Sequence, residues 1–316
     1  MNPSTCVDLT IPDHIHAGGL LPFISLLATP QDEAEVRLDF AGLRRVSPAG
    51  LVALAAAVTR WLRQGKHVVF RNLDRCAITG YLQRMDVLRA CGADLPESFR
   101  RHEARGRFVP VKLVEHDVER TGREMALCLA PGGDDYAHPL AALYDLAWYV
   151  FTETANNTRQ HSQGLGYAAA QVMRSEGLVR IAIADNGRGI RQSFLDAGLP
   201  WAPGMTDAEA ILKAFEPKVS SKGRPTNEGV GLTLVTGLVR QSRGWLLVVS
   251  GSGVVRIAPD GVPASGELPG GACFPGTIVV TAFRQKSLTD FAGLLHQAKV
   301  QSGLLQSAGA AGKFSA

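Results

Sequence analysis

The feature that most constrains this chain is a helix, predicted over residues 138–160, that carries polar side chains along one face. Glu153, Asn157 and His161 recur at four-residue intervals, which places them on the same side of a helix. A row of this kind on its own is more often a solvated helix face than a site. Two glycine-rich turns follow it in the sequence, and their order and content favour a binding site.

The first turn ends a predicted strand within residues 178–190, LVRIAIADNGRGI. Asp185 stands at the end of the strand, and Gly187 and Gly189 follow at two-residue spacing. Glycine allows unusual backbone angles and lets a flat ring lie against the main chain. The second turn, within residues 227–234, passes directly into a helix whose first amides can bind an anion. Together the two turns predict a purine-nucleotide pocket.

The composition is typical of a soluble globular protein. Of 316 residues, 46% are hydrophobic and 20% are charged, and the length suffices for two domains. The net charge of +4 comes from scattered basic residues rather than from the basic stripe of a nucleic-acid-binding protein. The apolar stretches are shorter than a membrane span, the N-terminus lacks a signal-peptide pattern, and the five cysteines form no CxxC pair. We therefore expect a cytoplasmic protein with reduced thiols, no DNA-specific motif and no membrane segment.

Residues 1–115 are predicted to form an N-terminal α/β domain. Strand and helix patterns alternate along it, with strands within 6–11, 35–40 and 67–73 and helices within 51–66 and 77–92. The apolar stripe predicted for the first of these helices consists of Leu51, Leu54, Val58 and Leu62. This order is typical of a small α/β sandwich. Residues 96–123, polar apart from a short strand candidate at 108–115, are expected to link it to a second domain.

The N-terminal segment resembles a STAS domain, the fold of the anti-sigma-factor antagonists. In that family a helix begins with Asp-Ser-Ser-Gly, and a partner kinase can phosphorylate the serine. The matching residues here are Ser47, Pro48, Ala49 and Gly50, so neither serine position keeps a hydroxyl group. The resemblance therefore implies a docking or sensing module rather than a phosphoacceptor. From the residues alone, Ser47 caps the helix and Pro48 occupies its first position.

Residues 116–285 are predicted to form the second domain, and residues 286–316 a C-terminal helix and flexible tail. Besides the motif-bearing helix, in which Leu143, Leu146 and Val150 mark the buried stripe, a helix is predicted over 206–215. Strands are predicted within 124–130, 178–185, 245–251, 253–259 and 276–283. They suit a sheet packed under the helices.

The ordered motifs of this domain resemble those of the Bergerat-fold, or GHKL, ATPases, over residues 120–283. This group includes sensor histidine kinases and anti-sigma serine kinases, and its fold is an α/β two-layer sandwich. The glutamate and asparagine of the family's first motif match Glu153 and Asn157. The resemblance implies that Asn157 ligates Mg²⁺ and that Glu153 orients or deprotonates the attacking water or hydroxyl group. It also implies that Asp185 accepts a hydrogen bond from the adenine amine of ATP.

The remaining family motifs supply the rest of the expected ATP site. The residues that match them are Gly187 and Gly189 at the base, Phe215 and Pro217 at the lid entry, Gly229, Gly231 and Leu232 under the triphosphate, and Gly276 and Thr277 at the adenine end. One departure is Thr233, where histidine kinases often have another glycine. The polar stretch 218–228, in which Lys218 and Lys222 can reach phosphates, is expected to become ordered only with nucleotide.

Several functions agree with these motifs. Residues 96–137 lack the heptad pattern of a dimerising hairpin, which disfavours a sensor kinase that phosphorylates its own histidine. The sequence favours a regulatory protein that uses Mg-ATP for hydrolysis or for phosphotransfer to a protein partner, similar to an anti-sigma serine kinase or a histidine-kinase-like ATPase. The main alternative is a non-catalytic, nucleotide-dependent protein-binding switch, and a third is a structural STAS-type scaffold that binds no nucleotide. The oligomeric state, a homodimer included, stays open.

Overall fold

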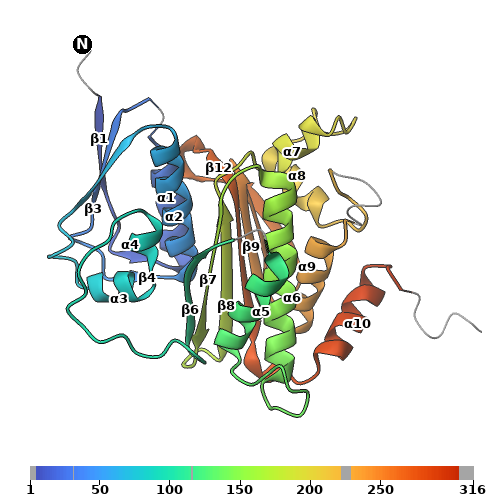
Figure 1. The fold of residues 1–316 in the computed structure, drawn as a ribbon. Helices are drawn as coiled ribbons and strands as arrows, with labels where there is room; N and C mark the ends of the chain where they lie inside the picture. The colour runs from blue at the N-terminus through green and yellow to red at the C-terminus, as the bar shows by residue number, and fades with distance from the viewer. Residues whose placement is uncertain (1–4, 31, 115–116, 222–228, 306–316) are drawn as a thin grey trace, which may run out of the picture.

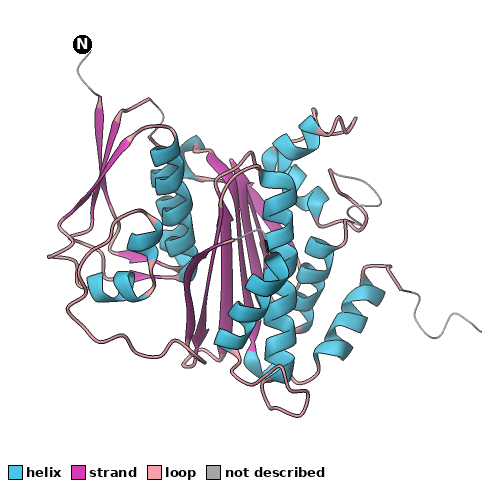
Figure 2. Cartoon of the chain, viewed as in Figure 1, coloured by secondary structure: helices cyan, strands magenta, loops and turns pink. Residues whose placement is uncertain are grey.

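A computed structural model describes residues 5–30, 32–114, 117–221 and 229–305. The chain has a mixed α/β structure in which layers alternate from sheet to helices to sheet to helices (Figures 1 and 2). The first part contains β1 (Cys6–Thr10), β2 (His14–Ile15), α1 (Leu20–Ala28), β3 (Glu35–Asp39), β4 (Arg45–Val46), α2 (Pro48–Arg63), β5 (His67–Arg71), α3 (Thr79–Arg84) and α4 (Val87–Ala90). The second part contains β6 (Phe108–Leu113), α5 (Val118–Leu129), α6 (Ala141–Asn157), β7 (Gly166–Met173), β8 (Leu178–Asp185), α7 (Ile190–Asp196), α8 (Asp207–Ala214), α9 (Gly231–Gln241), β9 (Trp245–Gly251), β10 (Gly253–Ile257), β11 (Pro263–Glu267), β12 (Phe274–Arg284) and α10 (Phe291–Gln301).

The outer sheet is small and parallel, with strand order β1-β3-β5. Its three strands coincide with the strands predicted in the first part of the sequence. Alternate side chains such as Leu9, Val36 and Leu38 point inward and are buried. The sheet therefore presents one apolar face to the helices beneath it.

Helix α2 is buried on both sides between the two sheets (Figure 1). Ser47 caps it by accepting a hydrogen bond from the amide of Gly50 at 3.5 Å, as predicted. The predicted stripe is wrong at Leu62, which is 43% exposed, while most other residues of the helix are buried. A helix that packs against a sheet on each side needs apolar residues all round rather than along one stripe.

Three other sequence predictions are wrong in type or extent. The helix predicted over 77–92 is interrupted, because Asp86 has a left-handed backbone (φ 55°) that separates α3 from α4. The strand predicted over 124–130 is part of helix α5, whose buried residues recur every three or four positions. A short apolar window cannot distinguish these two cases, and the cap at Asp117 decides for the helix. Strand β7, rich in alanine, was not predicted.

The main sheet is antiparallel and seven-stranded, with strand order β11-β10-β9-β12-β8-β7-β6. Both faces of the sheet are buried along β12, where Ile278 and Val280 join one core cluster and Val279 and Phe283 join another. Strand β6, which begins at Phe108, pairs with β7. It therefore belongs to this sheet, although residue 115 was the expected domain boundary.

One face of the main sheet is covered by α1 and α2 and the other by α5, α6, α8 and α9, while α10 packs on the outer side of α9 (Figure 1). The first core cluster combines residues of the outer sheet, of α2 and of the main sheet. The two parts of the chain thus share a core. No helix among the described residues has the length and apolar character needed to span a membrane.

Candidate functional site

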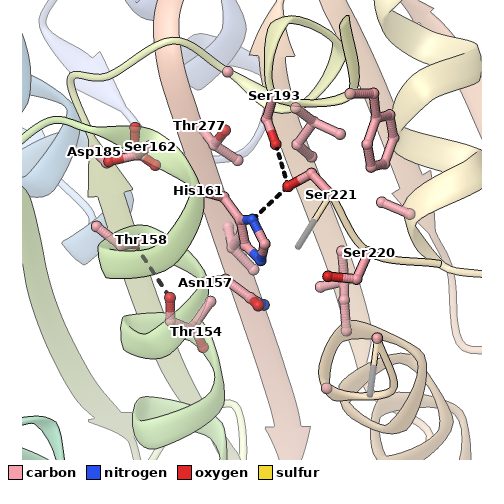
Figure 3. A pocket seen from close by; sticks show the side chains of 18 of the residues that line it. Thr154, Asn157, Thr158, His161, Ser162, Asp185, Ser193, Ser220, Ser221 and Thr277 are labelled. Carbon is pink, nitrogen blue, oxygen red and sulfur yellow. Dashed lines mark hydrogen bonds between the residues drawn. The ribbon is translucent and has the colours of Figure 1, made fainter. Parts of the chain in front are cut away.

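A cavity of about 100 Å³ lies between strands β8 and β12 of the main sheet and helices α6, α7 and α9. Its wall is apolar along the strands, where Ile183 and Val279 line it, and polar along the helix edge (Figure 3). The polar side chains of the wall are Thr154, Asn157, Thr158, His161, Ser162, Asp185, Ser193, Ser220, Ser221 and Thr277. A cavity lined by apolar side chains together with convergent polar groups is typical of a small-ligand site.

Helix α6 continues into a π-helical turn at Thr158–Ser162, which the sequence did not predict. The wider turn ends at Gln163, whose backbone is left-handed (φ 60°). Such turns are frequent at functional sites, because they shift side chains away from the regular helical spacing. Here the turn brings His161 and Ser162 to the same cavity as Asn157.

Asp185 ends strand β8, lines the cavity and is only 4% exposed. The amide of Gly187 donates to its Oδ1 at 2.9 Å. Burial raises the pKa of Asp185 to about 7, although hydrogen bonds from the Gly187 and Thr277 amides and the Ser162 hydroxyl act in the opposite direction. The carboxyl group therefore titrates near neutral pH and can accept hydrogen bonds from a ligand.

Glycines let three backbone segments meet around Asp185. A Cβ atom at Gly187 would collide with the carbonyl group of Ser162, and one at Gly276 would collide with the carbonyl oxygen of Asp185. Gly276 also has a backbone conformation (φ 115°) that favours glycine. The DNGRG turn and the later glycine–threonine pair thus form one packed unit with the end of helix α6.

Ser250 of strand β9 fixes the second glycine of that turn. Its Oγ accepts a hydrogen bond from the amide of Ile190 at 2.8 Å and lies 3.1 Å from Oγ1 of Thr277. Gly189, between these groups, has a left-handed backbone (φ 78°) and lines the cavity. The turn is thereby held against β9 and β12.

Glu153 lies beside the cavity rather than on its wall. A Cβ atom at Gly231, the first residue of α9, would collide with the Glu153 carboxylate. Burial raises the pKa of Glu153, and the nearby Glu119 carboxylate adds to the effect. The carboxylate therefore lies at the N-terminus of α9. Its pKa is higher than that of an exposed glutamate.

The structure brings together most of the predicted site residues. Those that line the cavity are Asn157, Asp185, Gly189, Gly229, Gly231, Leu232 and Thr277. Gly187 lies directly behind the wall, and Phe215 packs against the core at the end of α8. Lys218 is exposed, with its amide bonded to the carbonyl of Gly229 at 3.0 Å. Lys222 and most of the predicted lid lie outside the described residues.

A hydrogen-bonded chain of side chains crosses the cavity wall (Figure 3). Oγ of Ser221 lies 2.6 Å from Nδ1 of His161, and the hydroxyl of Ser193 donates to Ser221 Oγ at 2.8 Å. Nε of Arg188 donates to the carbonyl of His161 at 2.6 Å and fixes the backbone beneath the ring. Sequence reasoning missed Ser193, although its position one helical turn after Gly189 is a usable signal.

Asn186 connects the candidate site to the N-terminal part of the chain. It directly follows Asp185, and its Nδ2 donates to the carbonyl of Ala56 and to Oγ1 of Thr59, both at 3.1 Å. Its Oδ1 accepts from the amide of Leu165 at 2.8 Å. Helix α2 is therefore bonded to the turn that carries Asp185.

Comparison of the chain with protein-family models and with curated protein sequences gives no match. The chemistry of the site must then be judged from its own residues. A buried acceptor at Asp185, an amide oxygen at Asn157 and a glycine-rich helix N-terminus can hold a flat heterocycle, a cation and an anion, respectively.

Proposed function

We propose that this chain is an ATP-binding regulatory protein. On this proposal residues 108–284 form a Bergerat-type (GHKL) domain, similar to those of histidine kinases and anti-sigma serine kinases, and the preceding part is STAS-like. The observation that carries the proposal is that Asp185, Asn157 and Gly231, from three separate elements, line one cavity. These are the positions to which the family motifs assign base, metal and phosphate binding.

The cavity residues fit a nucleotide. Asp185 is a buried acceptor beside Thr277. Side chains are excluded at Gly187 and Gly276 because a Cβ atom there would meet backbone, so the turn stays narrow enough for a ring to approach the main chain. The described cavity of about 100 Å³ is smaller than the roughly 300–1,000 Å³ of drug-sized ligand pockets. We therefore infer that it would hold the base, and that the phosphates would lie toward α9.

Asn157 would hold Mg²⁺ through its side-chain oxygen. The described residues contain no group of three or more His, Cys, Asp or Glu side chains that could bind a metal by themselves. Mg²⁺ commonly takes few protein ligands and completes its shell with phosphate and water oxygens. A single protein ligand at Asn157 is therefore compatible with Mg²⁺ that binds together with the phosphates of a nucleotide.

Glu153 would act as the general base. Bound ATP supplies the phosphoryl group, and the carboxylate would take the proton from the attacking water or from the hydroxyl group of a protein partner. Burial raises the pKa of Glu153 toward the working pH, and a general base is most effective when its pKa lies near that pH.

A second function is favoured by one observation. Glu153 does not line the cavity and packs against Gly231 instead. This arrangement agrees with a non-catalytic protein in which ATP switches a protein-binding surface. In that case the STAS-like part, bonded to the site through Asn186, would present or sense the surface.

Calorimetry and phosphate release test the proposal together. We expect Mg-ATP to bind the wild-type protein, and Asp185→Asn to weaken binding by the roughly 1.5–3 kcal/mol of a charge-assisted hydrogen bond. Glu153→Gln should retain binding and lose turnover. Asp74→Asn, at an exposed carboxylate that does not line the cavity, is the matched control. Wild-type protein without measurable ATP binding contradicts the proposal, and binding without turnover in the wild type selects the switch.

A further inference from the structure

A second hollow, with a volume of about 470 Å³, lies along helices α5 and α6 and the loop that joins them. Its lining residues come from the first turns of α5, from loop residues 133–136 and from α6. None of the residues in this groove lines the nucleotide cavity. Its size falls in the range of small-ligand sites, roughly 300–1,000 Å³.

Four carboxylates surround the groove. Asp117 is used as the cap of α5 and accepts from the amide of Arg120 at 2.9 Å. Glu119, Asp134 and Asp145 make no side-chain hydrogen bond or ion pair with any described residue. Burial raises the pKa of Asp145, so this carboxylate lacks both full hydration and a compensating partner.

Three aromatic side chains complete the lining. Tyr136 is 93% exposed and Trp148 is 37% exposed. Tyr144 is only 8% exposed, and its hydroxyl group has no hydrogen-bond partner among the described residues. The hydroxyl oxygen is not one of the fully buried unpaired atoms of the described residues, so it is accessible on the groove wall, where a ligand can bond to it.

Two arginines also belong to the groove but do not neutralise it. Nε of Arg120 lies 3.3 Å from Oε1 of Glu124, outside the groove, and Arg123 is within 4.0 Å of no carboxylate among the described residues. The lining therefore keeps a net negative charge. A metal ion is disfavoured, because the described carboxylates do not converge in groups of three or more.

We propose that the groove between α5 and α6 is a binding site for an organic cation that carries a guanidinium or primary ammonium group. The aromatic faces attract such a cation through the ring quadrupole, and Asp145 accepts its N–H donors. The Tyr144 hydroxyl provides one further acceptor. The cation can come from a free amine or from a basic side chain of a protein partner. The proposal does not depend on nucleotide binding.

Titration calorimetry on the full chain tests this site with two probes, agmatine and the peptide N-acetyl-Gly-Arg-Gly-amide. We expect both the Asp145 carboxylate and the Tyr144 hydroxyl to matter, so Asp145→Asn should raise the Kd at least about tenfold and Tyr144→Phe about threefold. Asp74→Asn removes the same charge from an exposed carboxylate outside the groove and should change the Kd less than about twofold. ATP affinity should stay unchanged in all three variants, which separates this site from the nucleotide cavity.

The two probes distinguish the sources of the cation. A peptide that binds at least as tightly as agmatine supports a basic side chain of a partner, whereas tighter agmatine binding supports a free amine. The proposal is overturned if neither probe binds, or if Asp145→Asn binds both as tightly as the wild type. Should Asp145→Asn fail to fold, Tyr144→Phe and Trp148→Leu serve instead, because each keeps the charge of the groove.

Discussion

Asp185 shows how one buried side chain can determine both ligand choice and stability. Asp185 ends a core strand and is only 4% exposed. A ligand donor would add to the hydrogen bonds that the Gly187 and Thr277 amides and the Ser162 hydroxyl already give this carboxyl group, which is the physical basis of adenine selection in the proposed function. The same burial makes the ligand-free protein sensitive to pH.

The pKa of Asp185 predicts the sign of this pH dependence. Its value of about 7 exceeds the ordinary 3.8, so the folded state holds the proton more tightly than the unfolded chain. The resulting contribution to the free energy of unfolding is fully present below about pH 4 and is lost as the pH rises through 7. At 1.36 kcal/mol per pKa unit, the total change is on the order of 4 kcal/mol.

Asp185→Asn should therefore remove a pH dependence that the wild type has. Urea unfolding without nucleotide, measured between about pH 4 and pH 8, should show the wild type losing stability relative to the variant as the pH rises. Asp74→Asn should run parallel to the wild type, because that carboxylate is exposed. Parallel curves for Asp185→Asn would mean that the carboxyl group is solvated in the folded protein.

Helix α9 and helix α6 meet at a glycine, and a second prediction concerns this contact. Gly231→Ala would place a methyl group against the Glu153 carboxylate, so we expect a loss of about 1–3 kcal/mol in unfolding free energy. Combining it with Glu153→Ala should restore part of this loss, because the neighbour is then removed. Gly80→Ala, in helix α3 with only ordinary contacts to Phe99, is the matched control and should be close to neutral. Additive effects in the double variant would place the Glu153 side chain elsewhere.

Elements that carry the site could be predicted from the sequence better than those that surround it. Strand β8, the start of α9 and the capped helix α8 have local signals, namely an apolar run into a glycine turn, a glycine-to-helix transition and the Thr206–Glu209 capping box. The π-helical turn and the break at Asp86 have no comparable signal, since packing rather than local propensity decides them. The contact between Ser221 and His161 joins residues far apart in sequence, and no spacing rule reveals it.

Helix α2 and the DNGRG turn are joined by Asn186, and a third prediction follows from this bond. Thr59→Val keeps the shape of the side chain but removes the acceptor of Asn186 Nδ2. We expect a loss of about 1 kcal/mol in stability and a weaker ATP affinity, although Thr59 does not line the cavity. Thr59→Ser keeps the hydroxyl group and should retain wild-type affinity. Unchanged affinity in Thr59→Val, with reduced stability, would limit the bond to a structural role.

The sequence suggested two domains joined by a polar linker, and in the structure one core cluster combines residues of both parts of the chain. The reason is that α2 supplies apolar residues to both sheets, and the main sheet is apolar on both faces. A sheet of a free-standing domain usually leaves one face polar. The alternation of small apolar residues on that second face, such as Ala169, Ala182 and Val249, is the signal that distinguishes the two architectures.

The shared core predicts that the chain unfolds as one unit. Trp61 of α2 is 2% exposed and lies in the same cluster as Ile278 and Val280 of the main sheet, so neither part can lose its structure without exposing the other. We expect a single calorimetric transition for the full chain, with a calorimetric enthalpy equal to the van't Hoff enthalpy. A fragment that starts at residue 108 should fail to fold, because it exposes an apolar sheet face.

If ATP binds as proposed, it should shift the whole transition to higher temperature rather than split it, since ligand binding to the native state stabilises every element of a two-state unit. Two separate transitions, of which only the later responds to ATP, would contradict the shared core and restore two independent domains.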